Sequence, residues 1–205
     1  MMKLSWAFIF YCTCFMLNVH ICLTSTDLFP NVAYNEATIY DFTEDDPFFE
    51  IVFPKSLQYT YRLRQAQNFG TDFLFPQRGL RLVLADPEDG CSRLYNGPQL
   101  NGAVALVIRG SCSFVSKAVQ VEKAGAVAVI VTDMDAATDT SFIEMIADGT
   151  ERKPSIPAYF LLGRNGEMIL QTLRTEHLDA AIINIPVNLT NVQITKLNQP
   201  PWIVW

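Results

Sequence analysis

Two apolar runs separated by one amphipathic stretch dominate the middle of this chain of 205 residues. Residues 103–108 and 126–131 consist almost entirely of Ala, Val, Leu and Ile, which predicts two buried strands. Between them, residues 113–124 carry apolar side chains at helical spacing, and Gly125 stands where a helix C-terminal cap belongs. The second run is suited to a strand covered on both faces. The segment therefore predicts a strand–helix–strand unit.

Further strands are predicted on both sides of this unit. They are short runs rich in β-branched and aromatic residues, bounded by Pro and Gly, and they cover residues 48–53, 57–63, 80–84, 157–162 and 180–187. Helical spacing of apolar residues predicts a helix at 164–174. The capping-box pattern Ser141-Phe142-Ile143-Glu144 predicts another short helix that ends at Gly149. No internal repeat or linker indicates a second domain.

The first 24 residues have the composition of a secretory signal peptide. After Lys3, residues 4–17 form an apolar run that is shorter than the roughly 20 residues needed to span a bilayer. A signal anchor is the alternative, because the cleavage pattern near Thr24 is indistinct. No later window is apolar over that length, so no transmembrane segment is predicted. Residues 25–47 follow as an acidic lead-in without a basic residue.

Removal of this leader changes the chemical inventory of the chain. Of five cysteines and two histidines, only Cys91, Cys112 and His177 lie beyond residue 24. An oxidising compartment favours a disulfide between the two cysteines, which would stabilise the fold by roughly 3 kcal/mol in a chain-entropy model. Asn188-Leu189-Thr190 is the one Asn-x-Ser/Thr triplet, and we expect an N-linked glycan on Asn188 within a C-terminal tail, residues 188–205.

The same inventory argues against most classes of enzyme. Every Ser-His or Cys-His scheme would have to use His177, which lies in a polar stretch at a predicted helix end. Two Cys and one His are fewer than the four ligands of a structural zinc site, and a disulfide between the cysteines would also leave too few for a catalytic zinc site. No phosphate-binding glycine loop is present. We therefore expect no catalytic residue, no cofactor and no bound metal. The formal net charge of -6 argues against nucleic acid as a partner.

One acidic stretch suggests calcium only weakly. Asp133, Asp135, Asp139 and Glu144 occupy positions 1, 3, 7 and 12 of a calcium-loop register. The register also requires an oxygen ligand at position 5 and Gly at position 6, where this chain has Ala and Thr. A solvated acidic loop is the favoured interpretation.

The strand–helix–strand unit also carries a motif. Arg109-Gly110-Ser111-Cys112-Ser113-Phe114 is followed by Lys117 and by Ala124-Gly125-Ala126. This pattern resembles the core of the protease-associated (PA) domain, and residues 156–161 with Gly166 resemble that family's next strand and helix. The resemblance implies an α+β domain at 48–187, with a mixed, partly barrel-like sheet of about seven strands and two or three helices. It also implies a domain that contacts substrates, cargo or neighbouring domains and performs no chemistry.

Three residues are candidates for binding. Arg109 follows a buried strand, so it either pairs with a carboxylate inside the domain, which we favour, or faces a ligand. Trp202 and Trp205 would bury a large apolar area if the tail folds back on the domain, and they would anchor a partner if it does not.

These features predict a secreted, non-enzymatic glycoprotein whose PA domain binds another protein. A luminal accessory protein that recruits cargo within the secretory pathway is the alternative. A calcium-modulated binder is less favoured.

Overall fold

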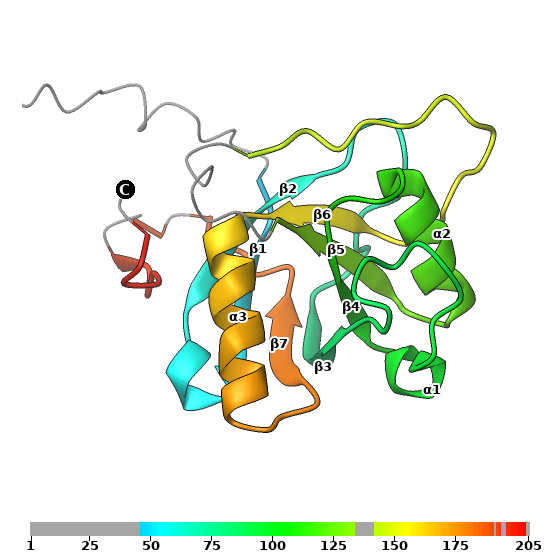
Figure 1. Ribbon diagram of the computed structural model, residues 1–205. Helices are drawn as coiled ribbons and strands as arrows, with labels where there is room; N and C mark the ends of the chain where they lie inside the picture. The colour runs from blue at the N-terminus through cyan, green and yellow to red at the C-terminus, as the bar shows by residue number, and fades with distance from the viewer. Residues whose placement is uncertain (1–45, 134–141, 191, 194–195, 204–205) are drawn as a thin grey trace, which may run out of the picture. The chain divides into compact units, whose positions relative to one another are not determined.

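The computed structural model describes residues 46–133, 142–190, 192–193 and 196–203. Within these residues seven strands close into a barrel of mixed direction, in the order β1-β2-β6-β5-β4-β3-β7 (Figure 1). The strands are β1 (Phe48–Phe53), β2 (Thr60–Gln65), β3 (Gln77–Leu84), β4 (Val104–Ile108), β5 (Ala128–Thr132), β6 (Ala158–Leu161) and β7 (Ala181–Ile185). The helices are α1 (Gly97–Leu100), α2 (Phe114–Lys123) and α3 (Gly163–Thr175), with a 3-10 turn η2 (Lys55–Leu57). The predicted α+β class with a barrel-like mixed sheet is confirmed.

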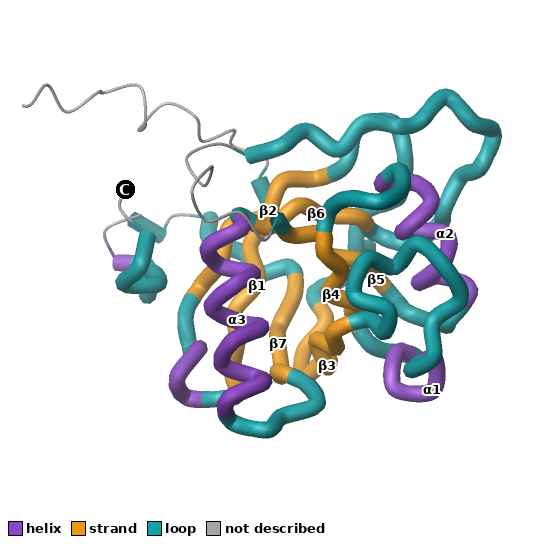
Figure 2. The backbone as a smooth tube through the Cα atoms, viewed as in Figure 1, coloured by secondary structure: helices purple, strands orange, loops and turns teal. Residues whose placement is uncertain are grey.

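The barrel has a parallel part and an antiparallel part. Strands β3, β4, β5 and β6 run parallel to one another. The other pairs, β1–β2, β1–β7, β2–β6 and β3–β7, are antiparallel and close the barrel. Parallel neighbours need a crossover connection, and α2 provides the one between β4 and β5. Helices α1 and α2 lie on one side of the barrel and α3 on the other (Figure 2). No helix among the described residues is long and apolar enough to cross a membrane.

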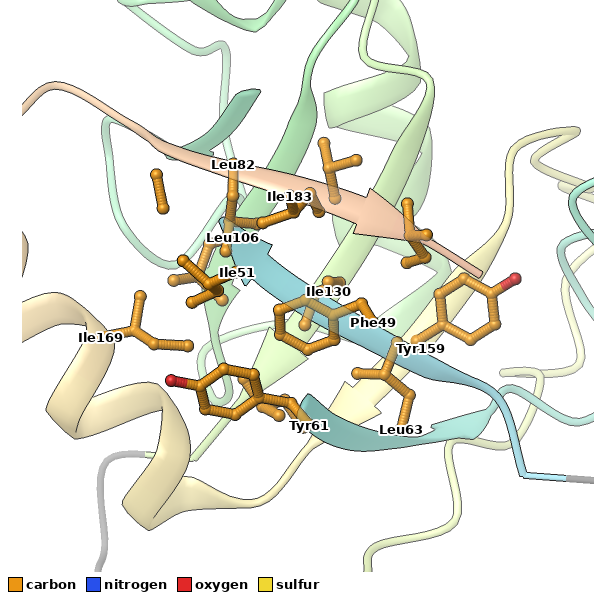
Figure 3. Close-up of a cluster of buried hydrophobic side chains, with 14 of the residues drawn as sticks. Phe49, Ile51, Tyr61, Leu63, Leu82, Leu106, Ile130, Tyr159, Ile169 and Ile183 are labelled. Atoms are coloured by element: carbon orange, nitrogen blue, oxygen red, sulfur yellow. The ribbon is translucent and has the colours of Figure 1, made fainter. Parts of the chain in front are cut away.

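One hydrophobic cluster fills the barrel, because alternate side chains of every strand point inward (Figure 3). Phe49 and Tyr61 stack with ring centroids 4.9 Å apart. The Tyr61 hydroxyl donates a hydrogen bond to the Leu57 carbonyl oxygen at 3.0 Å, and burial raises the pKa of Tyr61 above its ordinary value. Helix α3 packs on the same cluster through its apolar face, which includes Ile169.

A second cluster lies on the opposite face of the parallel strands, beneath α2. Val107 and Val131 point to this face, and Val115 and Val121 cover it from the helix. Strand β4 and residues 128–131 of β5 are therefore apolar without interruption because both faces are buried, as the continuous apolar runs predict.

Close approach of α3 to β5 requires glycine at position 166. A Cβ atom on Gly166 would lie 1.9 Å from the Oγ1 atom of Thr132, which is itself fully buried. Glycine is favoured at position 125 for a different reason. The residue follows α2 with a φ of +85°, a left-handed conformation that other residues rarely adopt. The two glycines therefore set how α3 packs on the sheet and how the chain returns from α2 to β5.

The helix predicted to start at Ser141 is not present in the described residues 142–149. The backbone there is extended instead: Gln67 N–H donates to the Met145 carbonyl oxygen at 2.7 Å, and Ala147 N–H donates to the Gln67 carbonyl oxygen at 3.2 Å. Met145 is fully buried. The prediction was wrong because pairing with a distant segment and burial of Met145 outweighed the local capping pattern.

Two arginines hold the start of this extended segment. The guanidinium groups of Arg62 and Arg64 lie 4.8 and 5.0 Å from the centre of the Phe142 ring. Arg62 Nε also donates to Asp46 Oδ2 at 2.6 Å. The last acidic residue of the lead-in is thus joined to β2 and, through the arginines, to the connection between β5 and β6.

Candidate functional site

The carboxyl ends of three parallel strands meet at one edge of the barrel. Arg109 follows β4, Asp133 follows β5, and Gly163 opens α3 directly after β6. We call this set of residues the carboxyl edge. In open sheets built from parallel strands, ligands bind at this end of the strands, where the connections diverge.

Arg109 and Asp133 form an ion pair across the carboxyl edge. Arg109 Nη1 lies 2.7 Å from Asp133 Oδ2, and the side chains are 45% and 20% exposed. The Arg109 backbone N–H donates to the Thr132 carbonyl oxygen at 2.8 Å, which continues the ladder between the two strands. Arg109 therefore pairs with a carboxylate of its own domain, and the pair remains open to solvent.

The calcium register is only partly within the described residues. Asp133 is engaged by Arg109 and Glu144 is exposed, whereas Asp135 and Asp139 lie outside the described ranges. In the part of the chain that the structure describes, no group of three or more His, Cys, Asp or Glu side chains is placed to hold a metal ion.

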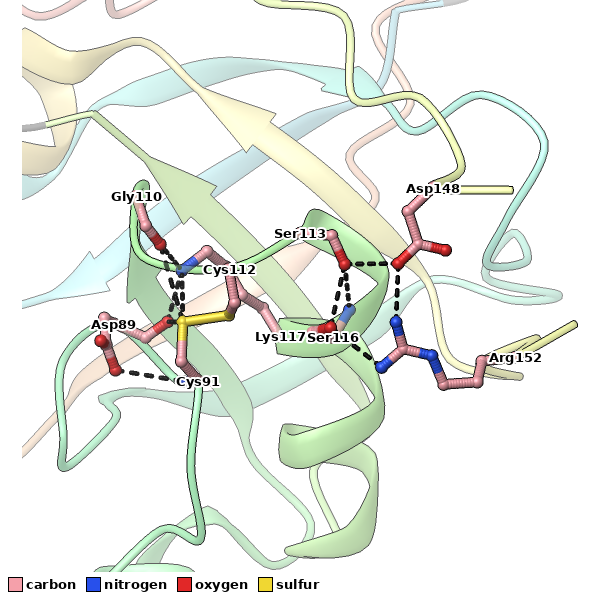
Figure 4. The surroundings of a disulfide bond; sticks show 9 residues. All are labelled: Asp89, Cys91, Gly110, Cys112, Ser113, Ser116, Lys117, Asp148 and Arg152. Atoms are coloured by element: carbon pink, nitrogen blue, oxygen red, sulfur yellow. Dashed lines mark hydrogen bonds and ion pairs between the residues drawn. A yellow bond between two sulfur atoms is a disulfide. The ribbon is translucent and has the colours of Figure 1, made fainter. Parts of the chain in front are cut away.

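The motif after β4 forms a turn that is joined to the preceding loop by a disulfide. Cys91 and Cys112 are bonded, with their Cα atoms 5.8 Å apart (Figure 4). Gly110 and Ser111 have φ values of 109° and 65°, so the chain turns sharply before Cys112. The disulfide thus joins the loop between β3 and α1 to the start of α2.

Lys117 is the buried support of this turn. Its side chain is fully buried, and its Nζ atom donates to the carbonyl oxygens of Asp89 at 2.5 Å and Gly110 at 2.7 Å. The same atom lies 3.4 Å from Cys91 Sγ. Burial lowers the pKa of Lys117, and the nearby charge of Asp89 opposes that shift. The sequence motif contains this lysine, but its role in holding two loops together is visible only in the structure.

A network of polar side chains fastens the β5–β6 connection to the start of α2. Ser113 caps the helix by accepting from Ser116 N–H at 3.1 Å, and its hydroxyl donates to Asp148 Oδ2 at 2.5 Å. Thr150 and Arg152 donate to the same carboxylate at 2.6 and 2.7 Å. The hydrogen bond from Ser113, followed by the one from Thr150, lowers the pKa of Asp148 to about 2.

The described part of the C-terminal tail folds back on the domain. Trp202 Nε1 donates to Asn165 Oδ1 at 3.0 Å, and the indole packs edge-on against Tyr59 with centroids 5.3 Å apart. Thr60 N–H donates to the Asn198 carbonyl oxygen at 2.7 Å. The favoured interpretation of Trp202 therefore agrees with the structure, while Trp205 lies outside the described residues.

The remaining predicted residues lie on the surface. Asn188 is exposed, and its Oδ1 atom accepts from Thr190 N–H at 2.9 Å. That hydrogen bond uses the amide oxygen and none of the Nδ2 hydrogens. His177 is exposed at the end of α3, with a left-handed φ of 53°.

Comparison with known proteins finds a matching family model and sequence relatives of this chain. The family model described as the PA domain matches residues 79–169. The "PRADC1-like protein" of Drosophila melanogaster is 45% identical over 170 residues, which is 82% of this chain and 87% of that protein. The "ER degradation-enhancing alpha-mannosidase-like protein 3" of Xenopus laevis is 39% identical over 113 residues, which is 52% of this chain but 12% of that protein.

Among solved structures, the aminopeptidase from Aneurinibacillus sp. strain AM-1 superposes with a TM-score of 0.49 and 18% sequence identity, over 70% of this chain and 30% of that one. The match to the PA domain model and the similarity to the Drosophila protein over most of both chains establish the family. This chain is a member of the PA domain family and a relative of the PRADC1-like protein.

Proposed function

We propose that this protein is a secreted, non-enzymatic glycoprotein whose PA domain binds another protein. The observation that carries the proposal is that the reactive groups of the motif are already used within the fold. Cys112 is in the disulfide, and the Lys117 ammonium is buried against two carbonyl oxygens. A nucleophile or base held in this way is not available to a substrate.

The position of His177 supports the same proposal. A catalytic base has to lie within hydrogen-bond reach of its nucleophile. His177 follows the end of α3, a helix of 13 residues whose start lies at the carboxyl edge. The His177 side chain is exposed, and within the described residues it forms no hydrogen bond with a Ser or Cys side chain.

We assign the binding role to the carboxyl edge. The ion pair between Arg109 and Asp133 offers charges of both signs that are open to solvent. An ion pair of this kind stabilises a fold by only about 0.5 kcal/mol, so a partner's charged group can replace either member at little cost. The β5–β6 connection, residues 133–157, starts at Asp133 of this edge and is much longer than ordinary connections, which is typical of binding loops.

Three features support passage through the secretory pathway. They are the leader-like first 24 residues, the disulfide, and the exposed Asn188 whose amide nitrogen is free of hydrogen bonds to the described residues. A disulfide forms in an oxidising compartment, and an exposed acceptor asparagine is accessible to glycosylation there.

A luminal accessory role is the second candidate. The similarity to the protein named for ER degradation favours it, although this chain corresponds to only 12% of that protein. Pulse-chase labelling with a glycan-maturation assay separates the two candidates. Rapid export with a mature glycan supports secretion, and a persistently immature glycan supports luminal retention.

The binding role is tested by charge reversal. The tagged protein is first used to capture and identify a partner from culture medium. Arg109→Asp should abolish capture of that partner, and the double variant Arg109→Asp/Asp133→Arg should restore only part of the capture. Reversal of the exposed pair Arg174–Glu88 is the matched control and should leave capture unchanged. No enriched partner, together with hydrolase turnover that His177→Ala abolishes, would overturn the proposal. A melting temperature that millimolar calcium leaves unchanged would remove the calcium-modulated alternative.

A further inference from the structure

We infer that the proximal sugars of an N-linked glycan on Asn188 pack on the exposed side chains of Phe75 and Leu74. The inference rests on the proposed glycosylation of Asn188 and assigns to the two apolar side chains a role that the sequence does not suggest. Its ligand class is an N-acetylglucosamine-containing glycan attached to the same chain.

The first observation is an apolar pair at a loop tip. Leu74 and Phe75 are 87% and 72% exposed, although loop tips are ordinarily small and polar. Large apolar groups that face water in this way mark contact sites or cause aggregation.

The second observation is that this loop is held in place on both sides of its tip. Phe73 stacks on Tyr159 with centroids 6.2 Å apart, and Thr71 Oγ1 donates to the Ser155 carbonyl oxygen at 2.8 Å. On the other side, Gln77 belongs to β3, and its side-chain amide donates to the Phe75 carbonyl oxygen at 3.1 Å. The exposed pair is therefore presented on a fixed backbone, which lowers the entropy cost of a contact.

The third observation places Asn188 at the same rim of the barrel. Gln77 pairs with Ile185 in antiparallel β3 and β7, so the chain before Gln77 and the chain after Ile185 leave the sheet together. Val187 N–H donates to the Phe48 carbonyl oxygen at 2.7 Å, which keeps the segment leading to Asn188 at this rim. Phe73 stacks on Tyr159, and Figure 3 shows Tyr159 beside the end of β7.

A sugar fits this surface better than a lipid bilayer does. The face of an N-acetylglucosamine ring carries C–H groups, which are attracted to the negative face of an aromatic ring. A glycan on Asn188 is tethered at the same rim, so its effective concentration near Phe75 is high, on the order of millimolar. The net charge of -6 opposes approach to an anionic membrane surface.

The experiment is a double-mutant cycle on the full chain secreted from glycosylating cells. Asn188→Gln and Thr190→Ala each remove the acceptor triplet by a different change, and Phe75→Ser removes the ring. Loss of the glycan should lower the melting temperature by about 2 °C when Phe75 is present and should have no such effect beside Phe75→Ser. Tyr95→Ser, which removes another aromatic ring that is 78% exposed, is the matched control and should show no coupling with Asn188→Gln.

Two further measurements test the contact itself. Trimming the glycan to one N-acetylglucosamine should preserve the melting temperature, because the proximal sugar makes the contact. The proton resonances of that sugar should be shifted upfield by the aromatic ring, and Phe75→Ser should abolish the shift.

The outcomes are distinguishable. An occupied Asn188 whose removal and Phe75→Ser have additive effects would overturn this inference and leave the proposed glycoprotein intact. An Asn188 that carries no glycan in glycopeptide mass spectrometry would overturn both.

Discussion

The Nζ atom of Lys117 and the carbonyl oxygen of Gly110 lie 2.7 Å apart in the interior of the domain. A second carbonyl oxygen, that of Asp89, accepts from the same ammonium group at 2.5 Å. One charged side chain thus donates hydrogen bonds to two loops that the disulfide also joins. Burial lowers the pKa of Lys117, and the nearby charge of Asp89 opposes that shift.

Replacement of this lysine should destabilise the domain even with the disulfide intact. Lys117→Met leaves the carbonyl oxygens of Asp89 and Gly110 without their buried donor, and we expect the free energy of unfolding to fall by about 2 kcal/mol in denaturant titration. Lys123→Met, an exposed substitution in the same helix, is the control and should change it little. An unchanged or higher stability of Lys117→Met would show that the cost of burying the ammonium exceeds the value of its hydrogen bonds.

Acid should weaken the attachment of the β5–β6 connection to α2. The pKa of Asp148 is lowered from 3.8 to about 2 in the folded protein, so its contribution to stability is fully present above about pH 4 and is lost as the pH falls toward 2. Asp148→Asn should therefore flatten the decline of melting temperature between these pH values. Asp179→Asn, at an exposed site, is the comparison and should leave the profile unchanged. A steep decline that persists in Asp148→Asn would assign the acid sensitivity to other groups.

The contact between α3 and β5 should tolerate no side chain at position 166. Gly166→Ala would place a Cβ atom 1.9 Å from Thr132 Oγ1, and the short β-branched side chain of Thr132 is fully buried and has little freedom to move away. We expect a loss of about 3 kcal/mol, measured by denaturant titration. Gln171→Ala, at an exposed position of the same helix, should cost almost nothing, since alanine is a good helix former. Near-wild-type stability of Gly166→Ala would mean that α3 shifts freely on the sheet.

Removal of the docked indole should lower thermal stability. Trp202→Ala removes an aromatic contact with Tyr59 and leaves Asn165, which is buried in α3, without the indole donor. A loss of about 2 kcal/mol is expected for this half-buried side chain. Pro201→Ala, at the exposed neighbouring position, is the control for the tail. Unchanged stability together with loss of a bound partner would instead favour an anchoring role for Trp202.

Much of the fold could be predicted from local patterns. Residues 104–108 and 128–131 are apolar without interruption, and the structure covers both faces of these strands. Helix α2 begins at a serine cap and ends beside a left-handed glycine, as the spacing from Ser113 to Gly125 predicts. These elements follow from the sequence because period and capping depend only on residues close in the chain.

Other elements depended on distant partners. The capping box at Ser141 predicts a helix, yet the described part of that segment is extended because Gln67 supplies backbone hydrogen bonds and Arg62 and Arg64 bind Phe142. The predicted strand at 57–63 begins only at Thr60, since the 3-10 turn Lys55–Leu57 precedes it. The four-residue helix Gly97–Leu100 is too short to produce a periodic signal.

The candidate site shows the same division. Arg109, Cys91 and Cys112 could be singled out from the sequence, because residue type and scarcity indicate them. The pairing of Arg109 with Asp133 could not, since it depends on β4 and β5 being neighbours. Leu74 and Phe75 belong to an apolar stretch that gives no sign of exposure, and only their position at a loop tip reveals it.

By itself the sequence determined the alternation of strands and helices, the cysteine pair, the acceptor triplet at Asn188 and the motif of the PA domain, all of which are local or compositional features. Only the tertiary structure decided that the barrel closes and that Lys117 is buried next to the disulfide. It also decided that the segment before Gln77, which contains Phe75, and the segment after Ile185, which leads to Asn188, start from the same rim of the barrel. The physical reason is that strand register and burial are set by contacts between segments far apart in the chain, whose energies no local pattern contains.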